Sequence, residues 1–93
     1  MARDQYRITF YPSATVRLDP LEFAWLLSKH NLEVVAYSDN AWPMLFVRAY
    51  YPHNVSGFMR DVNRVDGPLI FDHVEVVVDG SYVDFEAYEE ESG

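Results

Sequence analysis

Four side chains in the last third of the chain could together bind a metal ion or transfer protons. They are His73, Glu75, Asp84 and Glu86, which alternate along two segments of strand-like sequence. Hard divalent cations prefer carboxylate oxygens as ligands, and a carboxylate beside an imidazole can act in general acid–base catalysis. Their spacing matches no defined metal or catalytic signature, however, and a solvated acidic surface is the simpler interpretation. We therefore expect a protein without a cofactor and without enzymatic activity.

The charge of the chain is unevenly distributed. Its 93 residues carry a net charge of −8. The stretch up to Arg64 contains six acids and seven bases, whereas the stretch from Val65 onwards contains nine acids and neither Lys nor Arg. Glu89, Glu90 and Glu91 fit a solvated tail, but the other acids fall within sequence that is typical of strands. These acids either keep the protein soluble and deter pairing at a sheet edge, or form a functional surface.

The composition indicates a single folded domain. Apolar residues make up 49% of the chain and aromatic residues 16%, which is too much for a disordered segment. The absence of cysteine excludes disulfide scaffolds, thiolate metal sites and cysteine nucleophiles. No window approaches the roughly 18 apolar residues of a membrane span, and the start of the chain lacks the apolar core of a signal peptide, so we expect a cytoplasmic protein. We expect a domain at 1–88 and a flexible acidic tail at 89–93.

Hydrophobic periodicity and turn residues predict the element order β-α-β-β-α-β-β. Asp19 is placed to cap the first helix, which Asn31 can close in a left-handed conformation. Asn54 and Gly67 are placed to bound the second helix. The expected strands are 6–11 with a short bent extension at 14–18, 32–37, 42–51, 69–78 and 81–88, and the expected helices are 20–30 and 55–66.

Asp79 and Gly80 predict a two-residue hairpin turn, because both central residues of such a turn need positive φ. This turn places Val76 opposite Val83 on an apolar side, and Glu75 opposite Asp84 on the other side. Like charges directly opposite each other destabilise a sheet by a few tenths of a kcal/mol to about 1 kcal/mol, and we expect no cation near this pair. A local rule broken without compensation often marks function. The further pairs expected on the acidic side are His73 with Glu86 and Phe71 with Tyr88.

The element order resembles the ferredoxin-like split βαβ arrangement, with one strand added at the C-terminus. The resemblance covers nearly the whole chain. It implies an α+β domain with an antiparallel sheet, both helices on one face and the C-terminal hairpin at a sheet edge. Many unrelated functions are built on this fold, so the resemblance alone implies no activity.

The sheet face without helices is the expected place for a binding surface. The aliphatic and small residues Leu45, Val47 and Ala49 suit the helix-covered side of the third strand. Their neighbours then form an open face rich in aromatic side chains, larger than a monomer usually exposes. The inverse assignment would place Phe46 and Tyr50 in the core. The residues expected on the open face are Arg7, Thr9, Tyr11, Trp42, Met44, Phe46, Arg48, Tyr50, Phe71, His73, Val77 and Tyr82.

The segment Phe46-Val47-Arg48-Ala49-Tyr50 places an aromatic, a basic and an aromatic side chain on one face of a strand. In this respect it is similar to the RNA-recognition motif, which stacks bases on aromatic residues of its sheet. The glycines of that motif are absent, and a protein with a charge of −8 repels a phosphate backbone. We therefore expect no direct contact with nucleic acid.

The acidic hairpin gives the leading functional hypothesis. A row of carboxylates on a rigid strand edge suits the basic groove of a partner protein, including one that normally holds nucleic acid. Small acidic proteins of phages and mobile elements that block nucleases, restriction enzymes or CRISPR machinery are similar in size and charge. We expect a non-enzymatic inhibitor or regulator of this kind. The alternative is a homodimer that uses the open face for self-association or for binding a small ligand. The residues predicted to contact a partner are Asp72, Glu75, Asp79, Asp84, Glu86, Phe46, Arg48 and Tyr50.

Overall fold

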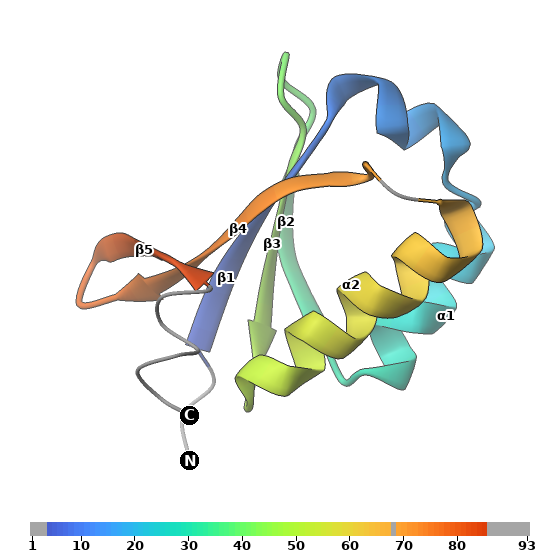
Figure 1. Cartoon of the computed structure of the whole chain (residues 1–93). Helices are drawn as coiled ribbons and strands as arrows, with labels where there is room; N and C mark the ends of the chain where they lie inside the picture. Colours follow the sequence, from blue (N-terminus) through green and yellow to red (C-terminus); the bar gives the residue numbers. More distant parts are fainter. Residues whose placement is uncertain (1–3, 68, 86–93) are drawn as a thin grey trace.

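A computed structural model describes residues 4–67 and 69–85 as one sheet with both helices on the same side (Figure 1). The elements in chain order are β1 (Asp4–Phe10), the 3-10 helix η1 (Pro12–Arg17), α1 (Pro20–Lys29), β2 (Glu33–Ser38), β3 (Met44–Ala49), α2 (Pro52–Asp66), β4 (Phe71–Val78) and β5 (Ser81–Asp84). Every strand pair is antiparallel, in the order β2-β3-β1-β4-β5. The first four strands in this order form the ferredoxin-like split βαβ arrangement, and β5 extends it beside β4. The predicted fold is confirmed.

Three predicted helix boundaries are confirmed. Asp19 caps α1, and its Oδ1 accepts a hydrogen bond from the main-chain N–H of Leu21 at 3.0 Å. Asn31 follows this helix in a left-handed conformation with φ of 57°. Gly67 ends α2 with φ of 94°, which favours glycine. Within the described part of the chain, no helix is long and apolar enough to cross a membrane.

Two prolines begin helices at positions where the sequence predicted the end of a strand. Pro12 begins η1, so the strand extension predicted at 14–18 is wrong. Pro52 begins α2 directly after Tyr51, so Asn54 lies within the helix and does not cap it. The fixed φ of proline suits the first position of a helix, where its missing N–H would have no partner within the helix. Because α2 starts here, β3 ends at Ala49, two residues earlier than predicted.

The β4–β5 hairpin has the predicted turn and register. Asp79 and Gly80 both have positive φ, at 51° and 80°. Val76 pairs with Val83 and is fully buried, so the apolar side of the hairpin faces the core. The pairs predicted for residues 86 and 88, and the tail predicted at 89–93, lie outside the described residues.

The core fills the space between the sheet and the helices. Leu45, Val47 and Ala49 are at most 5% exposed, which confirms the predicted orientation of β3. The aromatic centre of the core is Phe58 of α2, whose ring packs edge-on against Phe23 of α1 at 5.3 Å. The buried hydrophobic residues are Tyr6, Ile8, Phe10, Ala14, Leu26, Leu27, Leu32, Leu45, Val47, Ala49, Val55, Phe58, Val62, Ile70, Val74, Val76 and Phe85.

A β-bulge reverses the orientation predicted for Phe71. The pairing of β1 with β4 shifts at this point, so that Thr9 pairs with His73 and Phe10 pairs with Phe71. The ring of Phe71 lies 5.2 Å from that of Phe10 and 6.1 Å from that of Phe58, on the helix side of the sheet. Phe71 therefore packs against the core and does not belong to the open face. An extra residue in one strand turns the following side chains to the other face.

Candidate functional site

The open face, on the side of the sheet away from α1 and α2, changes from apolar to acidic across the strands. Met44 and Phe46 of β3 are half-buried and provide its apolar part. The β4–β5 hairpin provides the acidic part. The residues that face each other across the middle of this face are, from β2 to β5, Ala36, Phe46, Arg7, Glu75 and Asp84.

Arg7 lies at the centre of the open face and binds the acidic part. Its Nε and Nη2 donate hydrogen bonds to Oε1 of Glu75 at 2.9 and 2.5 Å. Its guanidinium carbon lies 3.7 Å from the ring centroid of Tyr82, in cation–π contact. The expectation that Glu75 has no cation nearby is therefore wrong. Arg7 is 68 residues away in sequence, but β1 pairs directly with β4.

His73 joins two of the predicted carboxylates. Its Nε2 lies 3.3 Å from Oε1 of Glu75, and its Nδ1 lies 2.5 Å from Oδ2 of Asp72. Asp84 pairs with Glu75 across the hairpin as predicted, and Glu86 lies outside the described residues. Among residues 4–67 and 69–85, no three His, Asp or Glu side chains gather closely enough to hold a metal ion. The cluster consists of the ion pair between Arg7 and Glu75 and the contacts of His73 with Glu75 and Asp72.

The carboxylates at the hairpin differ in exposure. Glu75 is half-buried beneath Arg7, whereas Asp72, Asp79 and Asp84 are exposed. Asp79 occupies the turn itself, and Asp72 and Asp84 lie on β4 and β5. A partner could therefore reach all three aspartates, of which Asp72 also contacts His73, whereas Glu75 lies beneath Arg7.

The aromatic residues predicted on the open face are partly accessible. Phe46 pairs with Arg7, and Arg48 with Gln5, so both point away from the helices and the inverse assignment is wrong. Arg48 is exposed, with Nη1 3.5 Å from Oε1 of Glu33. Tyr50 follows the end of β3 and is 47% exposed. The structure thus places Phe46 and Arg48 on the open face and Tyr50 at the end of the strand that carries them.

A hollow of about 380 Å³ lies where the hairpin meets α2. Met59, Phe71, Val74 and Phe85 give it an apolar lining, and Asp72, His73 and Asp84 also line it. Asp72 and Asp84 therefore adjoin apolar surface.

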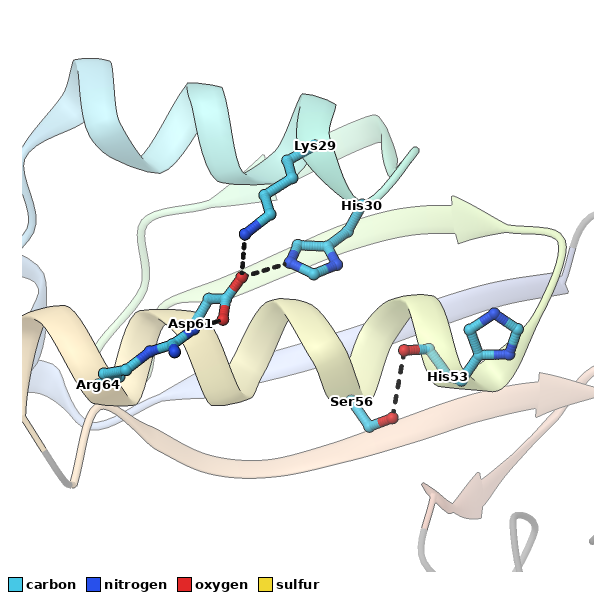
Figure 2. Close-up of polar contacts among 6 residues, drawn as sticks. All are labelled: Lys29, His30, His53, Ser56, Asp61 and Arg64. Carbon is cyan, nitrogen blue, oxygen red and sulfur yellow. Dashed lines mark hydrogen bonds and ion pairs between the residues drawn. The ribbon is translucent and has the colours of Figure 1, made fainter.

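A second polar cluster, which was not among the predicted sites, joins the two helices (Figure 2). Asp61 of α2 is 7% exposed, and its Oδ2 lies 3.0 Å from Nζ of Lys29 and 2.8 Å from Nε2 of His30. Arg64 binds its other oxygen. The hydrogen bonds from His30 and Lys29, with their positive surroundings, hold the pKa of the Asp61 carboxyl well below its ordinary value. The sequence feature that could have revealed this cluster is Asp61 itself, an acid between Phe58 and Val62 on the apolar stripe of α2.

The imidazole of His30 packs closely against α2. A Cβ on Gly57 would lie 3.1 Å from Cε1 and Nδ1 of His30, so the glycine lets the imidazole approach α2. Asp61 of α2 binds Lys29 and His30 at the end of α1, so the cluster fixes α1 against α2. On the same helix the hydroxyl of Ser56 donates to the main-chain carbonyl of His53, as Figure 2 shows.

Comparisons with protein-family models, with curated proteins and with solved structures find no match to this chain. The chemistry and geometry of the open face and its acidic edge are therefore the basis for a proposed function.

Proposed function

We propose that this protein is a non-enzymatic protein-binding module that docks its β4–β5 edge, with the adjoining open face, on a basic protein surface. The observation that carries the proposal is the row of exposed carboxylates of Asp72, Asp79 and Asp84 along one hairpin. This hairpin lies in the part of the sequence that contains neither Lys nor Arg. Such a row speeds and orients the approach of a basic partner.

The contact of Arg7 within the chain is a template for how an arginine of the partner would bind. Glu75 accepts two hydrogen bonds from its guanidinium, while the ring of Tyr82 lies beneath it. The hairpin therefore already combines a carboxylate and an aromatic ring around one arginine. Guanidinium groups favour this combination more than ammonium groups do.

The hollow beside the aspartates supports the same kind of partner. Arginine has an apolar stem and a charged end, and the stem is stabilised by contact with apolar surface. Met59 and Phe71 would contact the stem, and Asp72 and Asp84 would pair with the guanidinium.

Proteins that hold nucleic acid present such arginine-rich grooves. We therefore propose that the module competes with nucleic acid for a groove of this kind, as an inhibitor or regulator. Acidic phage proteins directed against nucleases or CRISPR machinery act in this sense, and the cytoplasm would be the place of action.

The test is a triple variant, Asp72→Asn, Asp79→Asn and Asp84→Asn, titrated with an oligo-arginine peptide at low and high salt. Asn preserves shape, and it tolerates the positive φ at position 79. Three exposed ion pairs at about 0.5–1 kcal/mol each correspond to roughly a tenfold loss of affinity or more at low salt. The affinity of the variant should also depend less on salt than that of the parent.

The matched control removes three acids from other elements, through Glu22→Gln, Glu33→Gln and Asp39→Asn. Both variants have the same net charge, so the proposal requires that the hairpin variant loses clearly more affinity. Equal losses would show that only total charge matters. Stronger binding of single-stranded RNA by the hairpin variant, with parent-like peptide binding, would instead indicate a nucleic-acid surface.

A second candidate function is self-association or small-ligand binding through the open face. It is favoured by the half-exposed side chains of Trp42 and Tyr50 at 48% and 47%. The ring of Trp42 already packs against Tyr11 at 6.1 Å. The charged pair of Arg7 and Glu75 at the centre of the same face favours a polar partner instead.

A further inference from the structure

We infer that a second copy of this chain binds at the β2 edge, where the two β2 strands pair antiparallel about a twofold axis and join the two sheets. This inference is independent of the proposed function, because β2 lies at the opposite edge of the sheet from the β4–β5 hairpin (Figure 1).

Apart from one bulge, β2 carries few of the features that usually protect an edge strand from pairing. Its six residues, Glu33 to Ser38, contain no Lys and no Pro, and native edges commonly carry one of these. Val34, Val35 and Tyr37 are 47%, 40% and 51% exposed. Its single charge, on Glu33, already lies near Arg48. An exposed strand of this composition favours pairing with another strand.

The bulge in β2 allows its side chains to match across a twofold axis. Residues three apart in a regular strand point to opposite faces. In β2, however, the pairing with β3 shifts between Val34 and Ala36. Val34 pairs with Val47 and Tyr37 pairs with Leu45, so both lie on the helix-covered side of the sheet.

Two β2 strands can pair antiparallel over all six residues in only one register. This register places side chains from the same face of the sheet opposite each other. In this pairing Val34 of one copy faces Tyr37 of the other, which is a favourable aromatic and β-branched pair. Glu33 then faces Ser38 on the open side, so the two glutamates do not oppose each other. A shift by one residue would set side chains of opposite faces against each other.

The charge distribution also selects this edge. The chain has a net charge of −8, which opposes self-association in general. In the joined sheet the two acidic hairpins lie at the outer ends, nine strand spacings apart, which is about 40 Å at roughly 4.8 Å per spacing. This exceeds the Debye length of about 8 Å at physiological salt. Pairing through β5 would instead bring the carboxylates of Asp84 close to those of the second copy.

Disulfide trapping tests the pairing directly, since the chain contains no cysteine. The variant Glu33→Cys, Ser38→Cys places one cysteine opposite another in the second copy, at a Cα separation of about 5 Å that suits a disulfide. Within one chain the two positions are about 17 Å apart, too far to bond. Mild oxidation of a dilute solution should give a species of twice the 10.8 kDa monomer mass. The control, Ser28→Cys, Ser81→Cys, should form it much more slowly, and equal rates would overturn the inference.

Sedimentation and light scattering provide the second test. The parent should form a dimer whose dissociation constant rises about tenfold or more in Tyr37→Lys, because the edge then carries a charge. The matched variant Tyr82→Lys, at a similarly exposed tyrosine on the other edge strand, should leave the dimer intact. A parent that stays monomeric at high concentration, or a dimer that resists Tyr37→Lys, would overturn the β2 interface.

Discussion

At the scale of single residues, Asp61 links the two helices through ion pairs and hydrogen bonds. It is nearly buried, and its carboxylate contacts Lys29 and His30 at the C-terminal end of α1 and Arg64 on α2. Asp61→Asn removes the negative charge that these groups share. We expect the unfolding midpoint at neutral pH to fall by several degrees. The exposed Asp39→Asn should leave it unchanged.

The pH dependence of this effect follows from the lowered pKa of Asp61. The carboxyl is more acidic in the folded chain than its ordinary value of 3.8, so the ionised form stabilises the fold. This contribution is complete above the unfolded-state pKa and is lost as the pH falls below about 4 towards the lower pKa of the folded state. Urea unfolding of the parent and of Asp61→Asn should therefore differ at neutral pH and converge in acid. A difference that persists in acid would show that the effect is steric.

Sequence periodicity could not reveal the partners of these charged residues. It placed Arg7 on the open face and Glu75 on the hairpin, but it did not connect strands at opposite ends of the chain. The prediction that Glu75 and Asp84 form an uncompensated pair was therefore only partly correct. The strands pair as expected, but Arg7 binds Glu75 from the neighbouring strand. Long-range contacts of this kind depend on sheet order, which single-residue patterns do not encode.

At the scale of elements, the β4–β5 hairpin depends on the positive φ of its turn. Gly80 has φ of 80°, a conformation that costs a residue with a Cβ about 1–2 kcal/mol. We expect Gly80→Ala to reduce the free energy of unfolding by this amount, measured by denaturant titration. The matched variant Asp79→Asn should be neutral or slightly stabilising, because asparagine adopts positive φ readily. Equal destabilisation by both variants would contradict this explanation.

The elements that were predicted correctly are those that a few neighbouring residues determine. The hairpin and the cap at Asp19 were predicted correctly because two to four neighbouring residues determine them. Pro12 and Pro52 were interpreted only as the ends of strands, although proline also suits the first position of a helix. The orientation of Phe71 was missed because a bulge depends on the partner strand, in which Thr9 and Phe10 change register.

At the scale of the whole molecule, the two edges of the sheet have different chemistry. The β4–β5 edge carries exposed carboxylates, whereas the β2 edge carries Val34, Val35 and Tyr37 with one glutamate. Two strands, β3 and β1, separate the hairpin from β2. A basic partner on one edge and a second copy on the other would therefore bind without competing, and a dimer would present two acidic hairpins to its partners.

Two tyrosines of similar exposure test whether these surfaces are independent. Tyr50 lies at the end of β3 and is 47% exposed, and Tyr37 lies on β2 and is 51% exposed. Because both are half-exposed, each change to alanine should alter the free energy of unfolding by no more than about 1 kcal/mol. We expect Tyr50→Ala to weaken binding of the oligo-arginine peptide, through the loss of a cation–π contact, and to leave the dimer intact. Tyr37→Ala should weaken the dimer and leave peptide binding intact. A dimer lost in Tyr50→Ala would instead assign self-association to the open face.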